Sequence, residues 1–221
     1  MNYVFLFLIL GIFGFFLGKF IKHRSLYPFM PFRYDFRKRR DTFKRTLELL
    51  EKTNAKVIVE TGTSRHGLKG AKSNGAATIV FGKWAQRNKA ELHSVDISEE
   101  SIHHSRQEVI RQRLEDTVTL HLSDSVAFLR GFERPIDLLY LDSYDYSDTD
   151  TEIQQKSQQH HLDEFKAIEH RLHKNTIVLI DDCDLPNGGK GKLLVAYMLT
   201  KNWRIAINAY QILLVDKDFV L

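Results

Sequence analysis

The sequence lacks cysteine pairs and internal repeats. Cys183 is the only cysteine among 221 residues, which excludes an internal disulfide and fits a reducing compartment without proving one. The one low-complexity stretch is the Asp-, Thr-, Gln- and Ser-rich segment 147–159. The apolar content of 43% is ordinary for a globular protein, and the length fits one α/β domain of about 180 residues plus an N-terminal appendage.

The folded domain also lacks an excess of basic residues, although the net charge of the whole chain is +4. Ten Lys or Arg and two Asp lie between Lys19 and Arg45, so 22 basic and 26 acidic residues remain for the rest of the chain. The domain itself is therefore mildly acidic. Because a nucleic-acid footprint should be a basic face on the domain, we expect no nucleic-acid partner.

The N-terminal segment carries one long apolar run. Residues 3–18 contain no charge and would form a helix of about 24 Å, or about 28 Å if the helix continues to Ile21. This length predicts a single transmembrane anchor over 1–22, a basic linker over 23–45 and a folded domain over 46–221. A cleaved signal peptide is the alternative, but no basic residue precedes the run and no small-x-small cleavage site follows it.

The basic residues after the apolar run predict the orientation of the anchor. By the positive-inside rule they place the domain on the cytoplasmic side of a membrane. Gly14 and Gly18 form a GxxxG pair, which can let membrane helices pack closely, although such pairs are more often incidental. A homodimer therefore stays open.

Apolar, β-branched runs alternate with helical patterns along the domain. We expect strands at 56–60, 91–96, 117–122, 136–142 and 176–181, and helices at 76–88, 99–114, 125–131 and 158–172. This order predicts a Rossmann-like α/β fold with a mostly parallel sheet. The runs 204–209 and 211–215 are so close that they permit only an antiparallel hairpin, giving seven strands.

Four of the expected strands end in an acidic residue: Glu60, Asp96, Asp142 and Asp181. In an open parallel sheet, ligands bind outside the carboxyl ends of the strands, near the point where strand order reverses. The pattern therefore predicts one shared polar site for a nucleotide-like cofactor and a possible cation.

Over residues 56–215 this arrangement resembles the class I S-adenosylmethionine-dependent methyltransferases. The segment ETGTSRHG starts at Glu60 and lacks the GxGxxG pattern of dinucleotide-binding proteins; the resemblance implies that Glu60, Gly62 and Thr63 surround the methionine part of the cofactor. It also implies that Asp96 binds the ribose hydroxyls and that Ile97 packs on the adenine. The alternative for Asp96 is a residue that merely precedes a helix capped by Ser98.

Two further residues follow the third expected strand. The resemblance implies that Asp124 and Ser125 contact the adenine, although a plain helix N-cap explains Asp124 equally well.

The ends of the fourth and fifth strands carry three carboxylates: Asp142, Asp181 and Asp182. Strand ends about 5 Å apart would bring them close enough to repel, unless protons or a cation intervened. Oxygen ligands suit Mg²⁺, and the set resembles metal-dependent O-methyltransferases of the catechol, caffeoyl-CoA and macrolide-sugar types. A solvated acidic rim is the alternative. Asp142 and His161 are the candidate catalytic residues, with His161 as a general base, although a surface pair of His160 and His161 is an equally good interpretation. Tyr144 to Tyr146 are candidates for the acceptor pocket.

The expected function is therefore a membrane-anchored S-adenosylmethionine-dependent methyltransferase. We expect O-methylation of a small-molecule or lipid-like acceptor, assisted by Mg²⁺. Two alternatives stay open: a metal-independent N- or C-methyltransferase of the same fold, and a non-catalytic, membrane-tethered nucleoside-binding module.

Overall fold

The computed structural model describes residues 3–23, 29–31 and 33–220. Its central sheet has the order β3-β2-β1-β4-β5-β7-β6. The strands are β1 (Val57–Thr61), β2 (Glu91–Asp96), β3 (Val118–Leu122), β4 (Ile136–Leu141), β5 (Leu172–Ile180), β6 (Trp203–Asn208) and β7 (Ile212–Asp216). The first five strands pair in parallel, whereas β7 runs antiparallel to both β5 and β6. The predicted seven-stranded Rossmann-like sheet with a C-terminal antiparallel hairpin is confirmed.

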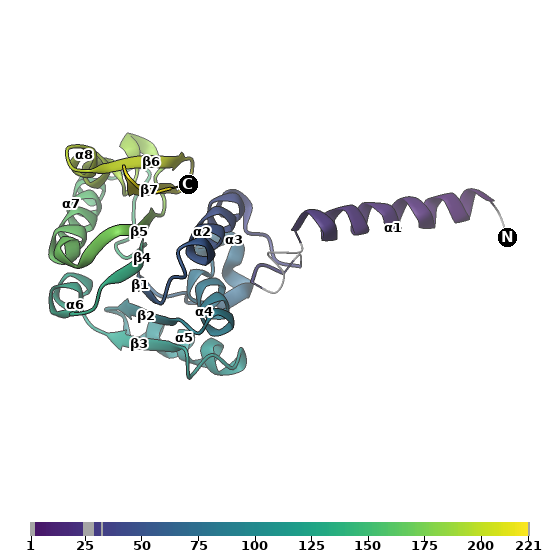
Figure 1. Cartoon of the computed structure of the whole chain (residues 1–221), viewed down its shortest axis with the longest axis horizontal. Helices are drawn as coiled ribbons and strands as arrows, with labels where there is room; N and C mark the ends of the chain where they lie inside the picture. The colour runs from purple at the N-terminus through teal and green to yellow at the C-terminus, as the bar shows by residue number, and fades with distance from the viewer. Residues whose placement is uncertain (1–2, 24–28, 32, 221) are drawn as a thin grey trace.

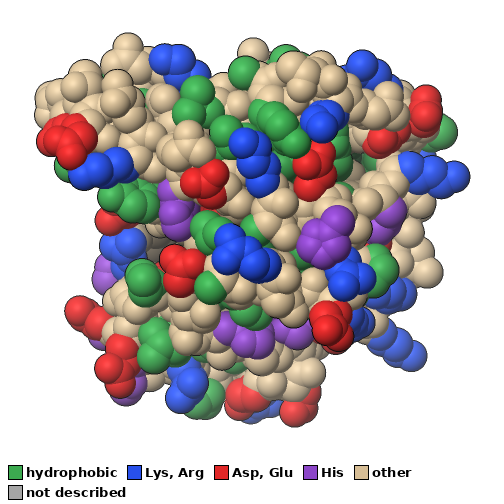
Figure 2. All heavy atoms as spheres, turned by 90° about the vertical axis from the view of Figure 1, so that its left-hand side faces the viewer, with side chains coloured by type: hydrophobic (Ala, Val, Ile, Leu, Met, Phe, Trp, Pro, Cys, Tyr) green, Lys and Arg blue, Asp and Glu red, His purple; other side chains and the backbone are tan. Residues whose placement is uncertain are grey.

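Helices cover both faces of this sheet (Figure 1). One layer contains α2 (Arg40–Lys52), α4 (Ala77–Asn88) and α5 (Glu99–Arg111), and the other contains α6 (Ser125–Gly131), α7 (Thr151–Ile168) and α8 (Lys192–Leu199). A short α3 (Ala71–Asn74) precedes α4. Because strand side chains alternate, Leu138 and Tyr140 join the core of the first layer, whereas Leu139 and Leu141 join that of the second. Figure 2 shows basic and acidic side chains interspersed over one face of the molecule.

Several expected boundaries differ from those of the structure, most of all at α7 and β5. Helix α7 begins at Thr151 and not at 158, because the Asp150 carboxylate accepts hydrogen bonds from the backbone N–H groups of Glu152 and Ile153 and caps the helix. Much of the low-complexity segment is therefore helical. Strand β5 begins at Leu172, four residues before the predicted start.

Helix α1 (Tyr3–His23) projects away from the sheet and its covering helices (Figure 1). Large apolar side chains along it are exposed, among them Phe7 at 73% and Phe13 at 64%. Within the described residues, no helix has the length and apolar character needed to cross a membrane, so the predicted transmembrane span is not found. Residues 1–2 of the predicted anchor, and 24–28 and 32 of the predicted linker, lie outside the described residues.

The predicted linker is in fact partly a component of the domain. Phe29, Met30 and Phe36 are 5% exposed or less and belong to the core under α2 and α4. The 3-10 helix over Arg37–Arg39 then leads directly into α2. The folded unit therefore includes residues well before the predicted start at 46.

Candidate functional site

The strand order reverses between β1 and β4, and the site lies at the carboxyl ends of these strands. Gly62 follows β1 with φ +83°, and a Cβ atom there would overlap the backbone carbonyl of Asp142 at the end of β4. Only glycine fits this approach of two strands. The turn after β1 consequently opens toward the ends of β2 and β4.

Asp96 connects the ends of β1 and β2. One carboxylate oxygen accepts a hydrogen bond from the Thr63 N–H at 3.1 Å, and the other accepts from the Ser98 N–H at 2.8 Å. Ser98 caps α5 through its own hydroxyl, so Asp96 is not the capping residue. Each Asp96 oxygen keeps a second lone pair, which a pair of ribose hydroxyls could use.

A cavity of about 460 Å³ begins at Asp96. Ile97 contributes an apolar wall, and its side chain is 74% exposed, as expected for a surface that a flat ring could cover. Asp124 and Ser125 also line the cavity, although the Asp124 carboxylate already caps α6 by accepting from the Ala127 N–H at 2.8 Å. The predicted adenosine residues are therefore brought together, and both interpretations of Asp124 have a structural basis.

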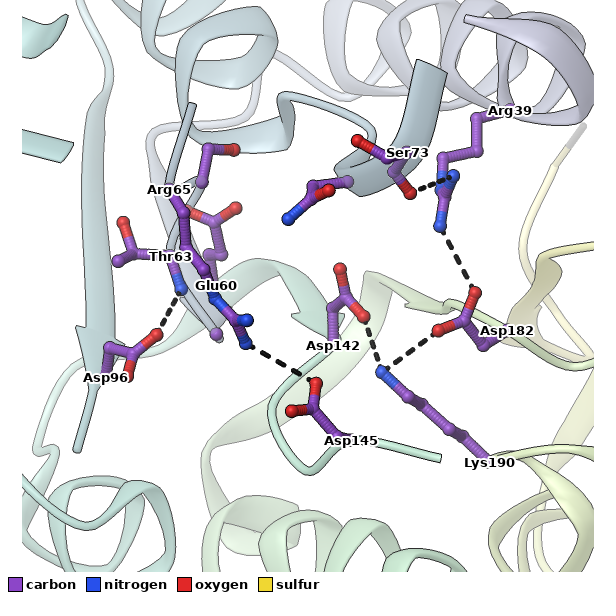
Figure 3. A pocket seen from close by; sticks show the side chains of 13 residues that line it. Arg39, Glu60, Thr63, Arg65, Ser73, Asp96, Asp142, Asp145, Asp182 and Lys190 are labelled. Carbon is purple, nitrogen blue, oxygen red and sulfur yellow. Dashed lines mark hydrogen bonds and ion pairs between the residues drawn. The ribbon is translucent and has the colours of Figure 1, made fainter. Parts of the chain in front are cut away.

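A second, polar cavity of about 190 Å³ adjoins the first one. Gly62, Arg65, Asp96 and Asp145 line both cavities. Arg65 Nη2 lies 3.4 Å from an Asp145 carboxylate oxygen, so this ion pair spans the junction (Figure 3). Sequence reasoning did not find Arg65, because an arginine in an expected cofactor turn carries no distinguishing signal.

Glu60 lines the polar cavity with no exposed surface. One carboxylate oxygen accepts a hydrogen bond from the Ser94 hydroxyl at 2.6 Å, while Oε1 has no hydrogen-bond partner among the described residues. Burial raises the pKa of Glu60 to about 8. A cationic ligand group in the cavity would stabilise the ionised Glu60 carboxylate, whose charge is otherwise costly to bury.

The three carboxylates at the ends of β4 and β5 do converge, and two cationic side chains lie among them. Figure 3 shows two of these carboxylates, Asp142 and Asp182, with Lys190 between them. Arg39 Nε contacts both Asp181 oxygens, at 2.7 and 3.1 Å, and its Nη2 lies 3.1 Å from Asp182. Lys190 Nζ lies 2.7 Å from Asp142 and 3.2 Å from Asp182. Tyr140 additionally donates to Asp181 at 2.8 Å, and Tyr210 donates to Asp182.

Burial and charge divide the protons within this cluster. Burial, which outweighs the attraction of Lys190, raises the pKa of Asp142 well above its ordinary value. Burial alone would lower the pKa of Lys190, but the carboxylates of Asp142 and Asp182 outweigh it and raise that pKa. Lys190 is therefore a fixed cation, and burial favours the protonated form of Asp142.

This geometry does not fit the predicted magnesium site. The oxygens of Asp142, Asp181 and Asp182 already accept hydrogen bonds or ion pairs from protein donors. Among the residues that the structure describes, no group of three His, Cys, Asp or Glu side chains is arranged to hold a metal ion. Arg39 was missed because it lies in the segment interpreted as a membrane linker. Lys190 was missed because it lies between Gly189 and Gly191, outside every expected strand and helix.

The position of His161 also differs from the prediction. Its side chain is fully buried, Nδ1 donates to the Ser157 carbonyl at 2.7 Å, and burial lowers its pKa to about 4. It lines neither cavity, so it cannot reach an acceptor there. The neighbouring His160 does line the larger cavity, beside Tyr144, and its Nε2 lies 3.0 Å from the Ser125 hydroxyl oxygen. Tyr146 instead donates to the Pro186 carbonyl at 2.6 Å.

Comparison with known proteins identifies the family of this chain. A family profile described as a methyltransferase domain matches residues 72–183, about half of the chain. The chain therefore belongs to this family of methyltransferase domains and is a class I S-adenosylmethionine-dependent methyltransferase. No curated protein matches it.

Solved structures share the fold at low sequence identity. A methyltransferase from Podospora anserina, solved with S-adenosylhomocysteine, is 16% identical with a TM-score of 0.58 over 91% of this chain and 87% of that one. A putative caffeoyl-CoA O-methyltransferase from Staphylococcus aureus is 14% identical, with a TM-score of 0.56 over 90% of each chain. An O-methyltransferase from Bacillus cereus, also with S-adenosylhomocysteine, is 15% identical, with a TM-score of 0.55 over 85% and 84%.

Proposed function

We propose that the chain transfers the methyl group of S-adenosylmethionine to a hydroxyl oxygen of a small or lipid-like acceptor. The observation that carries this proposal is the pair of adjoining cavities that meet at Gly62 and Asp96. The larger one has the apolar wall and the carboxylate that an adenosine requires. The smaller one is polar and contains Asp142 and Lys190, which suit an acceptor oxygen.

The cofactor would lie across the junction of the two cavities. Asp96 would accept hydrogen bonds from the ribose hydroxyls, and Ile97 would cover the adenine near Asp124 and Ser125. Gly62 and Thr63 would border the methionine part. The unpartnered oxygen of Glu60 would accept from the cofactor's ammonium, which is the cation its buried carboxylate lacks.

The reaction requires alignment more than activation, because the sulfonium carbon is already electrophilic. The acceptor oxygen would attack this carbon, forming the O–C bond as the C–S bond breaks and S-adenosylhomocysteine leaves. The hydroxyl proton would pass to the Asp142 carboxylate, whose raised pKa suits a proton acceptor. No step needs the predicted magnesium ion, because Arg39 and Lys190 already pair with the carboxylates that were expected to bind it.

Asp96→Asn tests the cofactor assignment. An amide keeps one acceptor oxygen but replaces the other by a donor, so we expect S-adenosylmethionine binding to weaken by about tenfold or more, given roughly 1.5–3 kcal/mol for a charged hydrogen bond. Isothermal titration calorimetry measures this loss. Asp116→Asn, at an exposed position outside both cavities, is the matched control. Equal affinity of the two variants would refute the assignment.

We further propose that the protein associates with a membrane through α1. The exposed apolar side chains of this helix, such as Phe7 and Phe13, support association because such surface is unfavourable in water. The cytoplasmic side and the lipid-like acceptor stay predictions. The full chain should co-sediment with phospholipid vesicles, and Phe7→Ser/Phe13→Ser should reduce the bound fraction severalfold. Ile110→Ser, which removes an exposed apolar side chain from α5, should not; if it reduces binding equally, α1 is not the contact.

A further inference from the structure

We propose that Arg39 and Lys190 replace the divalent cation of this site, and that the Lys190 ammonium donates a hydrogen bond to the acceptor oxygen, so that an acceptor needs only one hydroxyl. This inference rests on the proposed function, because it assumes that the polar cavity holds the acceptor. The site would then bind the acceptor oxygen by a hydrogen bond from a fixed side-chain cation, and not by chelation to a metal ion.

The two side chains divide the acidic cluster between them. Lys190 Nζ bridges Asp142 at the end of β4 and Asp182 after the end of β5, with distances of 2.7 and 3.2 Å. Arg39 pairs with Asp181 and with the other oxygen of Asp182. Two monovalent cations carry the charge of one divalent ion. A metal could therefore enter only by displacing at least one of them.

Lys190 is held in place by its loop. The side chain is 3% exposed, and its backbone N–H donates to the Asp182 carbonyl at 3.1 Å. The preceding Gly189 has φ +55°, and a Cβ atom there would overlap the same carbonyl, so glycine permits the loop to lie on the site. The ammonium is thus part of the folded structure.

Arg39 is equally fixed from the opposite side of the cluster. Its side chain is 6% exposed, and Nη1 donates to the Ser73 carbonyl at 3.2 Å. The guanidinium also lies over the Tyr210 ring, 4.8 Å from its centroid. These contacts come from three separate segments. The arrangement therefore has the supports expected of a permanent cation site.

The number of free N–H groups on Lys190 determines which molecules can receive the methyl group. An ammonium has three N–H bonds, and the contacts with Asp142 and Asp182 use two of them. One donor remains for the polar cavity that Lys190 lines. A metal ion can chelate two neighbouring oxygens, whereas one N–H binds a single oxygen. A lone hydroxyl, on a phenol or an alcohol, is consequently sufficient.

Metal binding and methyl transfer test this inference separately on the full chain. Calorimetry with Mn²⁺ should detect no binding to the wild type. The double variant Arg39→Met/Lys190→Met should bind Mn²⁺ with an affinity roughly tenfold or more above the detection limit for the wild type, because it removes the cations that pair with the three carboxylates. Lys192→Met, an exposed lysine two positions from Lys190, is the matched control and should behave as wild type. If the double variant does not fold, Mn²⁺ binding by the wild type and by Lys190→Met decides the question.

Transfer of a labelled methyl group to phenol, which has a single hydroxyl, completes the test. The wild type should methylate phenol equally in EDTA and in Mg²⁺. Lys190→Met should lower kcat/KM by about 100-fold, as for loss of one oxyanion donor, while cofactor affinity stays unchanged. Mn²⁺ binding by the wild type, or EDTA-sensitive activity restored by Mg²⁺, would overturn the inference. Failure of the wild type to bind S-adenosylmethionine would instead reject the proposed function, and absent Mn²⁺ binding would still support cation replacement.

Discussion

At the scale of single residues, Glu60 shows how burial prepares a group for a charged ligand. Its side chain lies near the end of β1 with no exposed surface, and only one of its carboxylate oxygens has a hydrogen-bond partner among the described residues. An ionised carboxylate in such a position is costly unless a cation comes close. The cofactor's ammonium would supply that cation, so free protein and complex should differ in how they respond to pH.

This residue should make the free protein less stable as pH rises. The pKa of Glu60 is about 8 in the folded state and 4.5 as a reference, so between these values the folded state binds more protons than the unfolded state. The free energy of unfolding should fall from pH 5 to pH 8, by on the order of 1 kcal/mol per pH unit. Glu60→Gln should flatten this fall in urea titrations, and Glu115→Gln, at an exposed position, should not. Parallel pH profiles for wild type and Glu60→Gln would contradict the raised pKa.

At the scale of elements, the sequence predicted what depends on local pattern. Alternating apolar runs located all seven strands, and the acidic strand ends indicated where the candidate site lies, because parallel strands bring their carboxyl ends to one edge. The ion pairs could not be predicted in the same way. Arg39 lies 142 positions from Asp181 in the chain, and nothing in a basic segment indicates that one of its arginines becomes buried. Similarly, His160 and His161 are equivalent by sequence, and only their positions around α7 separate the partly exposed His160 from the fully buried His161.

The turn after β1 should tolerate no side chain at Gly62. Alanine there would have φ +83° and would overlap the Asp142 carbonyl, so the end of β1 or β4 must shift. Gly62→Ala should lower the free energy of unfolding by about 1–3 kcal/mol. It should also weaken cofactor binding, as calorimetry would detect. Gly131→Ala is the matched control, because no atom lies within 4 Å of the added Cβ. A Gly62→Ala protein as stable as this control would contradict the close approach of the two strands.

At the scale of the whole molecule, the N-terminal segment connects the exposed helix α1 to the site. Phe29, Met30 and Phe36 lie in the core, and Arg39 pairs with Asp181 and Asp182. The basic residues that suggested a membrane linker therefore have two roles, since Arg37 and Lys38 are exposed whereas Arg39 is buried. Composition gives the charge of a segment, but the packing of each residue decides what that charge contacts.

Two truncations should separate the helix from the folded unit. Removing residues 1–28 deletes α1 but keeps the whole described core, so the melting temperature and S-adenosylmethionine affinity should match those of the full chain. Removing residues 1–45 also deletes Phe29, Met30, Phe36, Arg39 and Phe43. Each of the four apolar side chains contributes about 1.5–3 kcal/mol, and their sum is comparable to the total stability of a domain. This shorter chain should unfold or aggregate at room temperature, as circular dichroism and size-exclusion chromatography would detect. If it instead folded and bound cofactor like the full chain, the segment before α2 would be a linker after all, and Arg39 would be dispensable for holding Asp181 and Asp182.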